Sequence, residues 1–211
     1  MDKENFLAFY EKAGYRVVDS FTYSDIKPFL MRNRPRAKFR TIYVIVLLVV
    51  LFLVGLMVGI LWHDSTSAGQ FFLEIGKSVI LALVGYAVIV PLHEIIHWII
   101  YRTEGAADVR FGAIWRSFVF FAAAHNFLTD YKTFKRIALA PLRILSGLLV
   151  VLLLFPLPLW GKIAIAVLLF LHLLSCSGDL MMLAYMSRYK GREVYTVDDI
   201  DNRYTYFLEK K

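Results

Sequence analysis

The stretch TIYVIVLLVVLFLVGLMVGILW, residues 41 to 62, runs for 22 residues without one formal charge. A helix that crosses the ~30 Å hydrocarbon core of a bilayer needs about 20 apolar residues. The whole chain has 211 residues, 59% of them apolar, and a mean hydropathy of +0.59, which is too apolar for an ordinary soluble domain. The sequence therefore predicts an integral membrane protein.

Three further apolar blocks are long enough to span, at Val79–Tyr101, Ile137–Phe155 and Ile163–Ser187. The predicted fold is an all-α polytopic membrane protein with four transmembrane helices. We expect three segments: a cytoplasmic N-terminal segment, a four-helix transmembrane domain and a cytoplasmic C-terminal tail, at residues 1–40, 41–187 and 188–211.

Lysine and arginine gather on one side of these spans, and the other side carries only Lys77 and Lys162. By the positive-inside rule, both termini and the long loop between the second and third spans are cytoplasmic. The net charge of +7 then reflects topology in the cell membrane and attraction to the lipid bilayer rather than nucleic-acid binding. The single Cys176 excludes an internal disulfide and a multi-cysteine zinc cluster.

The segments outside the spans carry weaker patterns. Residues 2–15, DKENFLAFYEKAGY, have Phe6, Phe9 and Tyr10 at helical spacing, which favours a short amphipathic helix on the membrane surface. Residues 109–121, VRFGAIWRSFVFF, alternate in a way that predicts a strand or hairpin in the cytoplasmic loop. The tail, residues 192–207, reads as extended segments around an acidic turn.

Two histidines and a glutamate interrupt the second span, in the sequence HEIIH at residues 93–97. In a helix His93 and His97 lie on one face, one turn apart, while Glu94 lies about 100° around the helix. This is the H-E-x-x-H spacing with which two imidazoles bind zinc and the glutamate acts as general base. The alternative is a buried hydrogen-bonded cluster without metal. Pro91 just upstream should kink or loosen the helix.

A catalytic zinc ion usually takes three protein ligands, and Asp179 in the fourth span is the candidate for the third. His93 and Asp179 each lie eight residues before the cytoplasmic end of their predicted spans, so both sit roughly 12 Å from the same face. We therefore predict zinc held by His93, His97 and Asp179, with Glu94 as the catalytic residue. The alternative for Asp179 is an ion pair with Arg143.

Three more polar residues keep open interpretations. His172 is seven residues before Asp179 and is favoured as a packed, hydrogen-bonded residue. Arg143 is expected to snorkel to the cytoplasmic surface or to pair with Asp179 or Glu94, with binding of a substrate carboxylate as the lesser alternative. His125 could donate a hydrogen bond over the site or serve only as a loop residue.

The elements HEIIHW, IALAPLRIL and SGDLMM, with a histidine-containing basic loop between the first two, resemble a family of bacterial membrane proteins known as putative zincin peptidases. More distantly the layout is similar to the site-2 protease class of intramembrane metalloproteases. The resemblance implies the same zinc ligands and the same catalytic glutamate. Gly178 precedes Asp179, which departs from the Asp-Gly order and the Asn-Pro context common around the aspartate of site-2 proteases. We also expect no PDZ or other sensor domain.

The expected function is a membrane-embedded zinc metallopeptidase that hydrolyses peptide bonds of membrane or membrane-associated proteins near the cytoplasmic face. The alternative is a non-catalytic membrane protein with a structural or sensing zinc site. Expected partners are a membrane protein or peptide substrate and the lipid bilayer, with no nucleic acid.

Overall fold

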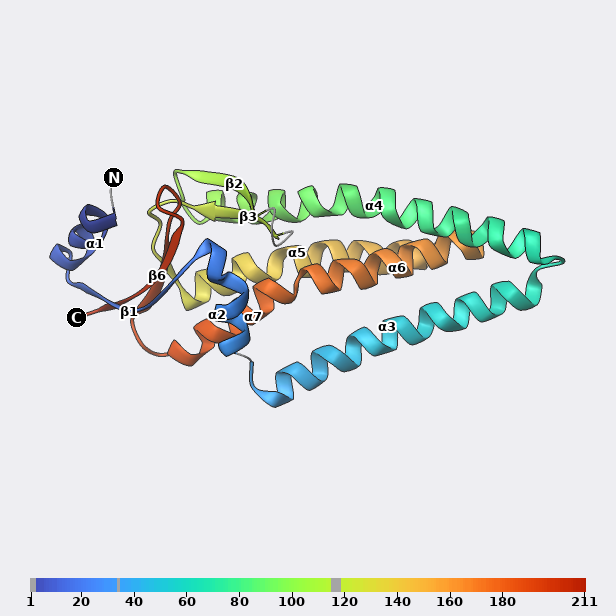
Figure 1. The fold of residues 1–211 in the computed structure, drawn as a ribbon, viewed down its shortest axis with the longest axis horizontal. Coiled ribbons are helices and arrows are strands. Elements are labelled where there is room, and N and C mark those ends of the chain that lie inside the picture. Colours follow the sequence, from blue (N-terminus) through green and yellow to red (C-terminus); the bar gives the residue numbers. More distant parts are fainter. Residues whose placement is uncertain (1–2, 34, 115–118) are drawn as a thin grey trace. The chain divides into compact units, whose positions relative to one another are not determined.

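The computed structural model describes residues 3–33, 35–114 and 119–211 (Figure 1). It has four helical segments that are long and apolar enough to cross a membrane: Lys38–Asp64, Ala68–Thr103, Tyr131–Leu153 and Leu159–Tyr189. Four helical segments that could cross a membrane, as predicted, are thus confirmed by length and composition, with bounds that differ from the predicted ones. The described residues also form a four-stranded sheet, so the all-α prediction holds for the spans but misses part of the fold.

Contacts divide the chain into two compact units, which we call the sheet unit and the helix unit. The sheet unit comprises Met1–Pro35, Glu94–Ala140 and Gly178–Lys211, and the helix unit comprises Arg36–His93 and Pro141–Ser177. The division of the sequence at residues 40 and 187 stays a prediction.

The helix unit is built from α3 (Ala37–Asp64) and α6 (Leu159–Ser175) together with most of α4 (Ala68–Thr103) and α5 (Tyr131–Leu153). Helices α4 and α6 lie close together at Gly85. A Cβ on this residue would lie 2.7 Å from the Leu168 side chain, so only glycine fits without a shift of that side chain. The Ser78 hydroxyl also donates to the Trp160 carbonyl at 2.8 Å. Helix α4 continues through Pro91 without interruption.

The sheet unit contains an antiparallel sheet in the order β1-β6-β5-β4. Its strands are β1 (Tyr15–Thr22), β4 (Thr129–Asp130), β5 (Val194–Asp199) and β6 (Tyr204–Lys210). Strands β5 and β6 confirm the predicted extended segments around an acidic turn. Strand β1 comes from the opposite end of the chain, with Tyr15 paired to Lys210.

Alternation along β6 gives the sheet two buried faces. Phe207 packs with Phe29 of α2 (Ile26–Arg32), while Tyr206 and Leu208 pack with Phe6 of α1 (Lys3–Lys12). The predicted N-terminal helix therefore exists, but its apolar face covers the sheet. The expectation that this face lies on the membrane surface is wrong, because Phe6 is fully buried against the sheet.

The predicted hairpin is confirmed where the structure describes it. Strand β2 (Val109–Ile114) pairs antiparallel with β3 (Val119–Ala124). Residues 115–118, including Trp115 and Arg116 of the predicted alternation, lie outside the described residues. The Phe121 ring covers Gly112, where a Cβ would come within 2.3 Å of it, and Phe121 meets Tyr23 edge-on at 5.0 Å.

The predicted fourth span is two helices rather than one. Helix α6 ends at Ser175, and α7 (Ser177–Met186) begins after Cys176. Two short 3-10 helices complete the described elements: η1 (Tyr23–Asp25) and η3 (Ser187–Tyr189). The interruption places Asp179 in the first turn of α7, where the helix dipole favours a negative charge.

Candidate metal centre

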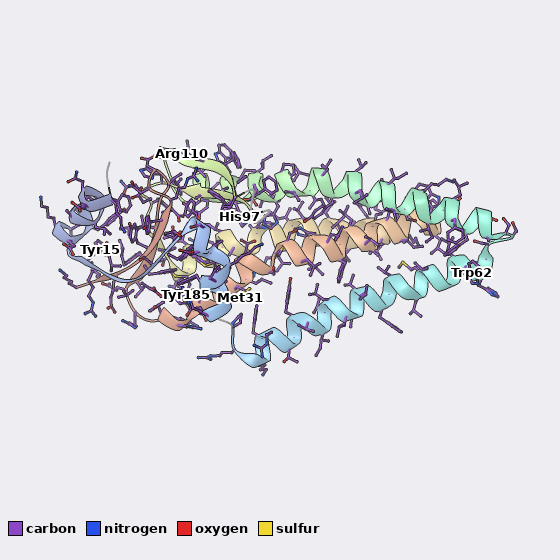
Figure 2. All side chains as sticks on the ribbon, in the orientation of Figure 1. Tyr15, Met31, Trp62, His97, Arg110 and Tyr185 are labelled. Atoms are coloured by element: carbon purple, nitrogen blue, oxygen red, sulfur yellow. The ribbon has the colours of Figure 1, made fainter. Side chains whose placement is uncertain are left out.

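His97 of α4 is labelled in Figure 2, and each of its two ring nitrogens faces an oxygen atom of the protein. The ring is buried, and its Nδ1 lies 3.1 Å from the backbone carbonyl oxygen of Ile137. Because a carbonyl can only accept, Nδ1 carries a proton. The same ring's Nε2 lies 3.4 Å from Oδ2 of Asp179. The carbonyl thus selects which nitrogen faces the carboxylate.

The separation of Nε2 and Oδ2 suits a shared metal ion. Two ligand atoms that each lie ~2.0–2.1 Å from a tetrahedral zinc ion are roughly 3.3–3.4 Å apart. In the neutral imidazole with a proton on Nδ1, Nε2 is an acceptor and faces a second acceptor, Asp179. Either a second proton on His97 or a cation between the two atoms would relieve that contact. A histidine whose outer N–H is bound to a carbonyl is also typical of zinc sites.

His93 lies one turn before His97 on the same uninterrupted helix, so the two imidazoles share a face of α4. Both histidines are 6% exposed. Glu94 is half-buried and, as the next residue along the helix, points about 100° away from His93. Two imidazoles and one carboxylate are a donor set that fits catalytic zinc.

Asp179 lies in the first turn of α7, and contacts near the end of that helix hold the helix in place. Tyr185, at the end of α7, is 2% exposed and donates its hydroxyl hydrogen bond to Asp19 of β1. Its ring meets Phe207 of β6 at 4.7 Å and Phe29 of α2 at 4.9 Å. The sheet therefore fixes α7, and with it the start of the helix that carries the carboxylate.

Residues 86–193 match the profile of a family described as "putative zincin peptidase". The match covers more than half of the 211 residues and contains His93, Glu94, His97 and Asp179. The chain belongs to this family. Membership suggests a metallopeptidase that binds zinc. No curated protein and no solved structure matched the chain.

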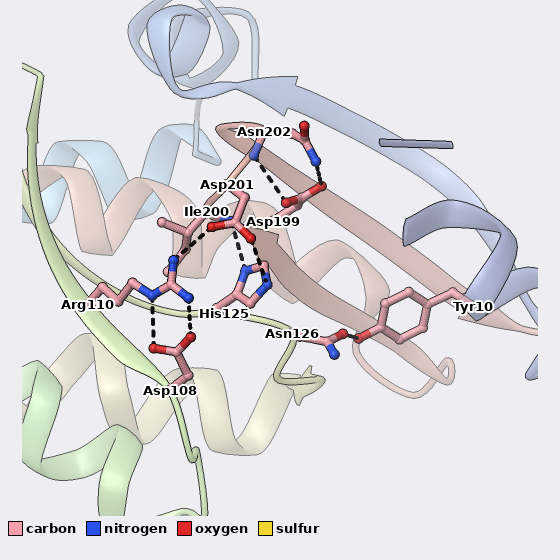
Figure 3. Close-up of polar contacts among 9 residues, drawn as sticks. All are labelled: Tyr10, Asp108, Arg110, His125, Asn126, Asp199, Ile200, Asp201 and Asn202. Carbon is pink, nitrogen blue, oxygen red and sulfur yellow. Dashed lines mark hydrogen bonds and ion pairs between the residues drawn. The ribbon is translucent and has the colours of Figure 1, made fainter. Parts of the chain in front are cut away.

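His125 of this zincin-family chain is engaged within the sheet unit (Figure 3). The backbone N–H of Ile200 donates to its Nδ1 at 3.1 Å, and its Nε2 lies 3.6 Å from Asp201. Arg110 bridges Asp201 to Asp108, and its hydrogen bonds hold the pKa of both carboxyl groups below their usual values. These contacts favour the interpretation of His125 as a loop residue.

Sequence reasoning missed the position of Cys176 beside two histidines of this zincin-family chain. Within the helix unit, its Sγ lies 3.6 Å from Nε2 of His172 and 4.0 Å from Nδ1 of His93. His172 is fully buried, as expected of a packed residue. The signal was in the sequence, because His172 and Cys176 are four residues apart and must share a helix face. Arg143 is exposed on α5, which is compatible with snorkelling.

Proposed function

We propose that this chain is a membrane-embedded zinc metallopeptidase that hydrolyses peptide bonds of membrane or membrane-associated proteins near the cytoplasmic face. The observation that carries the proposal is the 3.4 Å separation of His97 Nε2 and Asp179 Oδ2, with His97 Nδ1 bound to a carbonyl. His97 belongs to the helix with the H-E-x-x-H spacing, Asp179 to α7, and the chain to a family described as zincin peptidases.

His93, His97 and Asp179 would hold the zinc ion. When bound, zinc would act as a Lewis acid that polarises the scissile carbonyl and lowers the pKa of water. Glu94 lies around the helix from the two imidazoles, which supports a role in activating water rather than in completing the ligand set. It would accept the proton from the attacking water and deliver it to the departing amine nitrogen.

Insertion in a membrane is supported by the exposed surfaces of the long helices. Large apolar side chains point outward along them, with Phe52 65%, Phe72 67% and Ile80 65% exposed. Apolar surface of this extent indicates contact with lipid rather than water. The distribution of lysine and arginine supports a multi-pass protein of the cell membrane with both termini in the cytoplasm. A bacterial origin is proposed from the family resemblance alone.

Strand β2 is the candidate surface that presents the substrate. A helical substrate keeps its carbonyls in its own hydrogen bonds and must be extended before cleavage. Among the strands that the structure describes, β2 pairs with β3 alone, and addition of a peptide to its other edge would hold that peptide extended. Of the proposed edge, which begins at Arg110, the structure describes the residues up to Ile114.

A second candidate function is a non-catalytic membrane protein with a structural or sensing zinc site. The same donor atoms support it, because burial of both histidines suits a stable site as well as a catalytic one. The two functions differ in what they require of Glu94.

Glu94→Gln separates the two functions. The substitution preserves the shape of the side chain and removes the base, so the variant should keep about one zinc ion per chain. It should fail to cleave single-span substrate proteins in liposomes and should retain them in a co-purifying complex. Zinc content is measured by elemental analysis and cleavage by gel electrophoresis.

Glu74→Gln is the matched control, since Glu74 lies on the same helix and pairs with Lys77 at 2.9 Å. This control should retain both zinc and cleavage. If Glu94→Gln cleaves as fast as the wild type, Glu94 is not the base. If the zinc-loaded wild type cleaves none of the substrates, the peptidase proposal is withdrawn in favour of the structural zinc site.

A further inference from the structure

The helix unit contains a second group of metal-binding side chains, distinct in composition from the proposed hydrolytic set. His93, His172 and Cys176 offer ligand atoms that all lie within 4.8 Å of one another, and all three residues are buried. We propose that they form a thiolate-containing site for a soft or borderline ion such as Zn²⁺, which competes with the hydrolytic set for His93.

The distances agree with tetrahedral coordination. A sulfur ~2.3 Å and a nitrogen ~2.0–2.1 Å from one tetrahedral zinc ion are roughly 3.5–3.6 Å apart. The observed separation from Cys176 Sγ to His172 Nε2 is 3.6 Å, and that from Sγ to His93 Nδ1 is 4.0 Å. Binding therefore needs only a small movement of the His93 ring, whose plane is inclined at 68° to that of His172.

The ligand chemistry separates the two sets. The third ligand of the hydrolytic set is a carboxylate, whereas the third ligand of this set is a thiolate. The thiolate strengthens the preference of the site for soft and borderline ions. Cys176 has no exposed surface, and burial keeps water out of a fourth position better than at the half-exposed Asp179. The thiolate site is accordingly suited to storage of the ion rather than to hydrolysis.

The shared histidine gives the site a regulatory consequence, which rests on the proposed function. A neutral imidazole that coordinates through Nδ1 cannot serve a second metal ion through its protonated Nε2. Occupation of the thiolate site therefore withdraws one of three ligands from the hydrolytic set. Zinc held by His172 and Cys176 would keep the peptidase inactive until the ion is released from the thiolate.

Cobalt(II) is the spectroscopic probe, because thiolate ligation of Co²⁺ produces a charge-transfer band in the near ultraviolet that nitrogen and oxygen ligands do not produce. The detergent-solubilised full chain is stripped of metal and titrated with Co²⁺. In Asp179→Ala the hydrolytic set is disrupted, so the chain should still bind Co²⁺ and show the thiolate band at full intensity. In Cys176→Ser and Cys176→Ala the band should disappear.

The double variant Asp179→Ala/Cys176→Ala should bind Co²⁺ at least tenfold more weakly than Asp179→Ala, because only two histidines of the thiolate site remain. Gel filtration and far-ultraviolet circular dichroism verify that each variant is folded. Absence of the thiolate band from folded Asp179→Ala at saturating Co²⁺ overturns the inference and leaves the proposed peptidase intact. If that variant shows the band and also cleaves substrate, the thiolate site stands and the proposed hydrolytic set fails.

Discussion

At the scale of single residues, His97 illustrates how a backbone group can prepare a ligand. Its Nδ1 is bound by the Ile137 carbonyl, which leaves Nε2 toward Asp179. The spacing of His93, Glu94 and His97 was predictable because it is a local property of one helix. The contact with Ile137 was not, since it depends on how α4 and α5 pack, and hydropathy carries no information about that.

Asp198 of β5 provides a prediction about pH at the same scale. Burial raises the pKa of its carboxyl group to about 6. The hydrogen bond that Thr205 donates to it at 2.6 Å acts in the opposite direction and is the weaker effect. Between about pH 4 and pH 6 the folded chain therefore binds this proton more tightly than the unfolded chain. Protonated Asp198 therefore adds to the free energy of unfolding, and this stabilisation is fully present below pH ~4 and is lost as the pH rises through 6.

Because asparagine cannot ionise, we expect Asp198→Asn not to lose this stability as the pH rises. Relative to the wild type, its free energy of unfolding should rise between pH 4 and pH 7 by up to roughly 3 kcal/mol, at ~1.4 kcal/mol per pH unit. Thermal unfolding in detergent across this range measures the difference. Parallel pH profiles for the two proteins would show that Asp198 titrates as an ordinary carboxyl group.

At the scale of elements, long apolar helices and the β5–β6 tail were predictable from hydropathy and alternation. Strand β1 was not, because its register shifts between Val17 and Asp19, and the shift breaks the period of two. Its partner β6 also lies at the far end of the sequence, and no local pattern predicts a pairing between such distant segments. The break at Cys176 escaped prediction because apolar runs on both sides dominate the hydropathy of the span, and the short segment SCSGD, residues 175–179, contains no proline.

The hairpin of β2 and β3 depends on the absence of a side chain at Gly112. A Cβ there would lie 2.3 Å from the Phe121 ring, so Gly112→Ala must displace that ring from Tyr23. We expect a loss of ~1–3 kcal/mol in stability, as for other overpacked sites. If β2 presents the substrate, cleavage should fall as well. Thermal unfolding and cleavage assays measure the two effects.

Gly147→Ala on α5 is the control, because a Cβ there has no atom within 4 Å and should not destabilise the helix. Combining Gly112→Ala with Phe121→Leu should cost less than the sum of the single substitutions, since the smaller side chain makes room. Strict additivity of the two losses would refute the clash as their cause.

At the scale of the whole molecule, the charge asymmetry predicts a topology. Single cysteines introduced at Ser67 and Leu159 in a Cys176→Ala background should react with membrane-impermeant maleimide in intact cells. Cysteines near Met1, Phe120 and Lys211 should react only after the cells are opened. Labelling near Phe120 from outside would reverse the orientation and remove the placement of the metal centre near the cytoplasmic face.

The central claim is that His93, His97 and Asp179 hold zinc. An anomalous difference map collected at the zinc absorption edge tests it most directly, on crystals of the Cys176→Ala chain, which lacks the thiolate and retains the hydrolytic set. We expect one strong peak, ~2.0–2.2 Å from a nitrogen of each histidine and from an oxygen of Asp179. A folded, zinc-supplied chain with no peak among these three residues would contradict it.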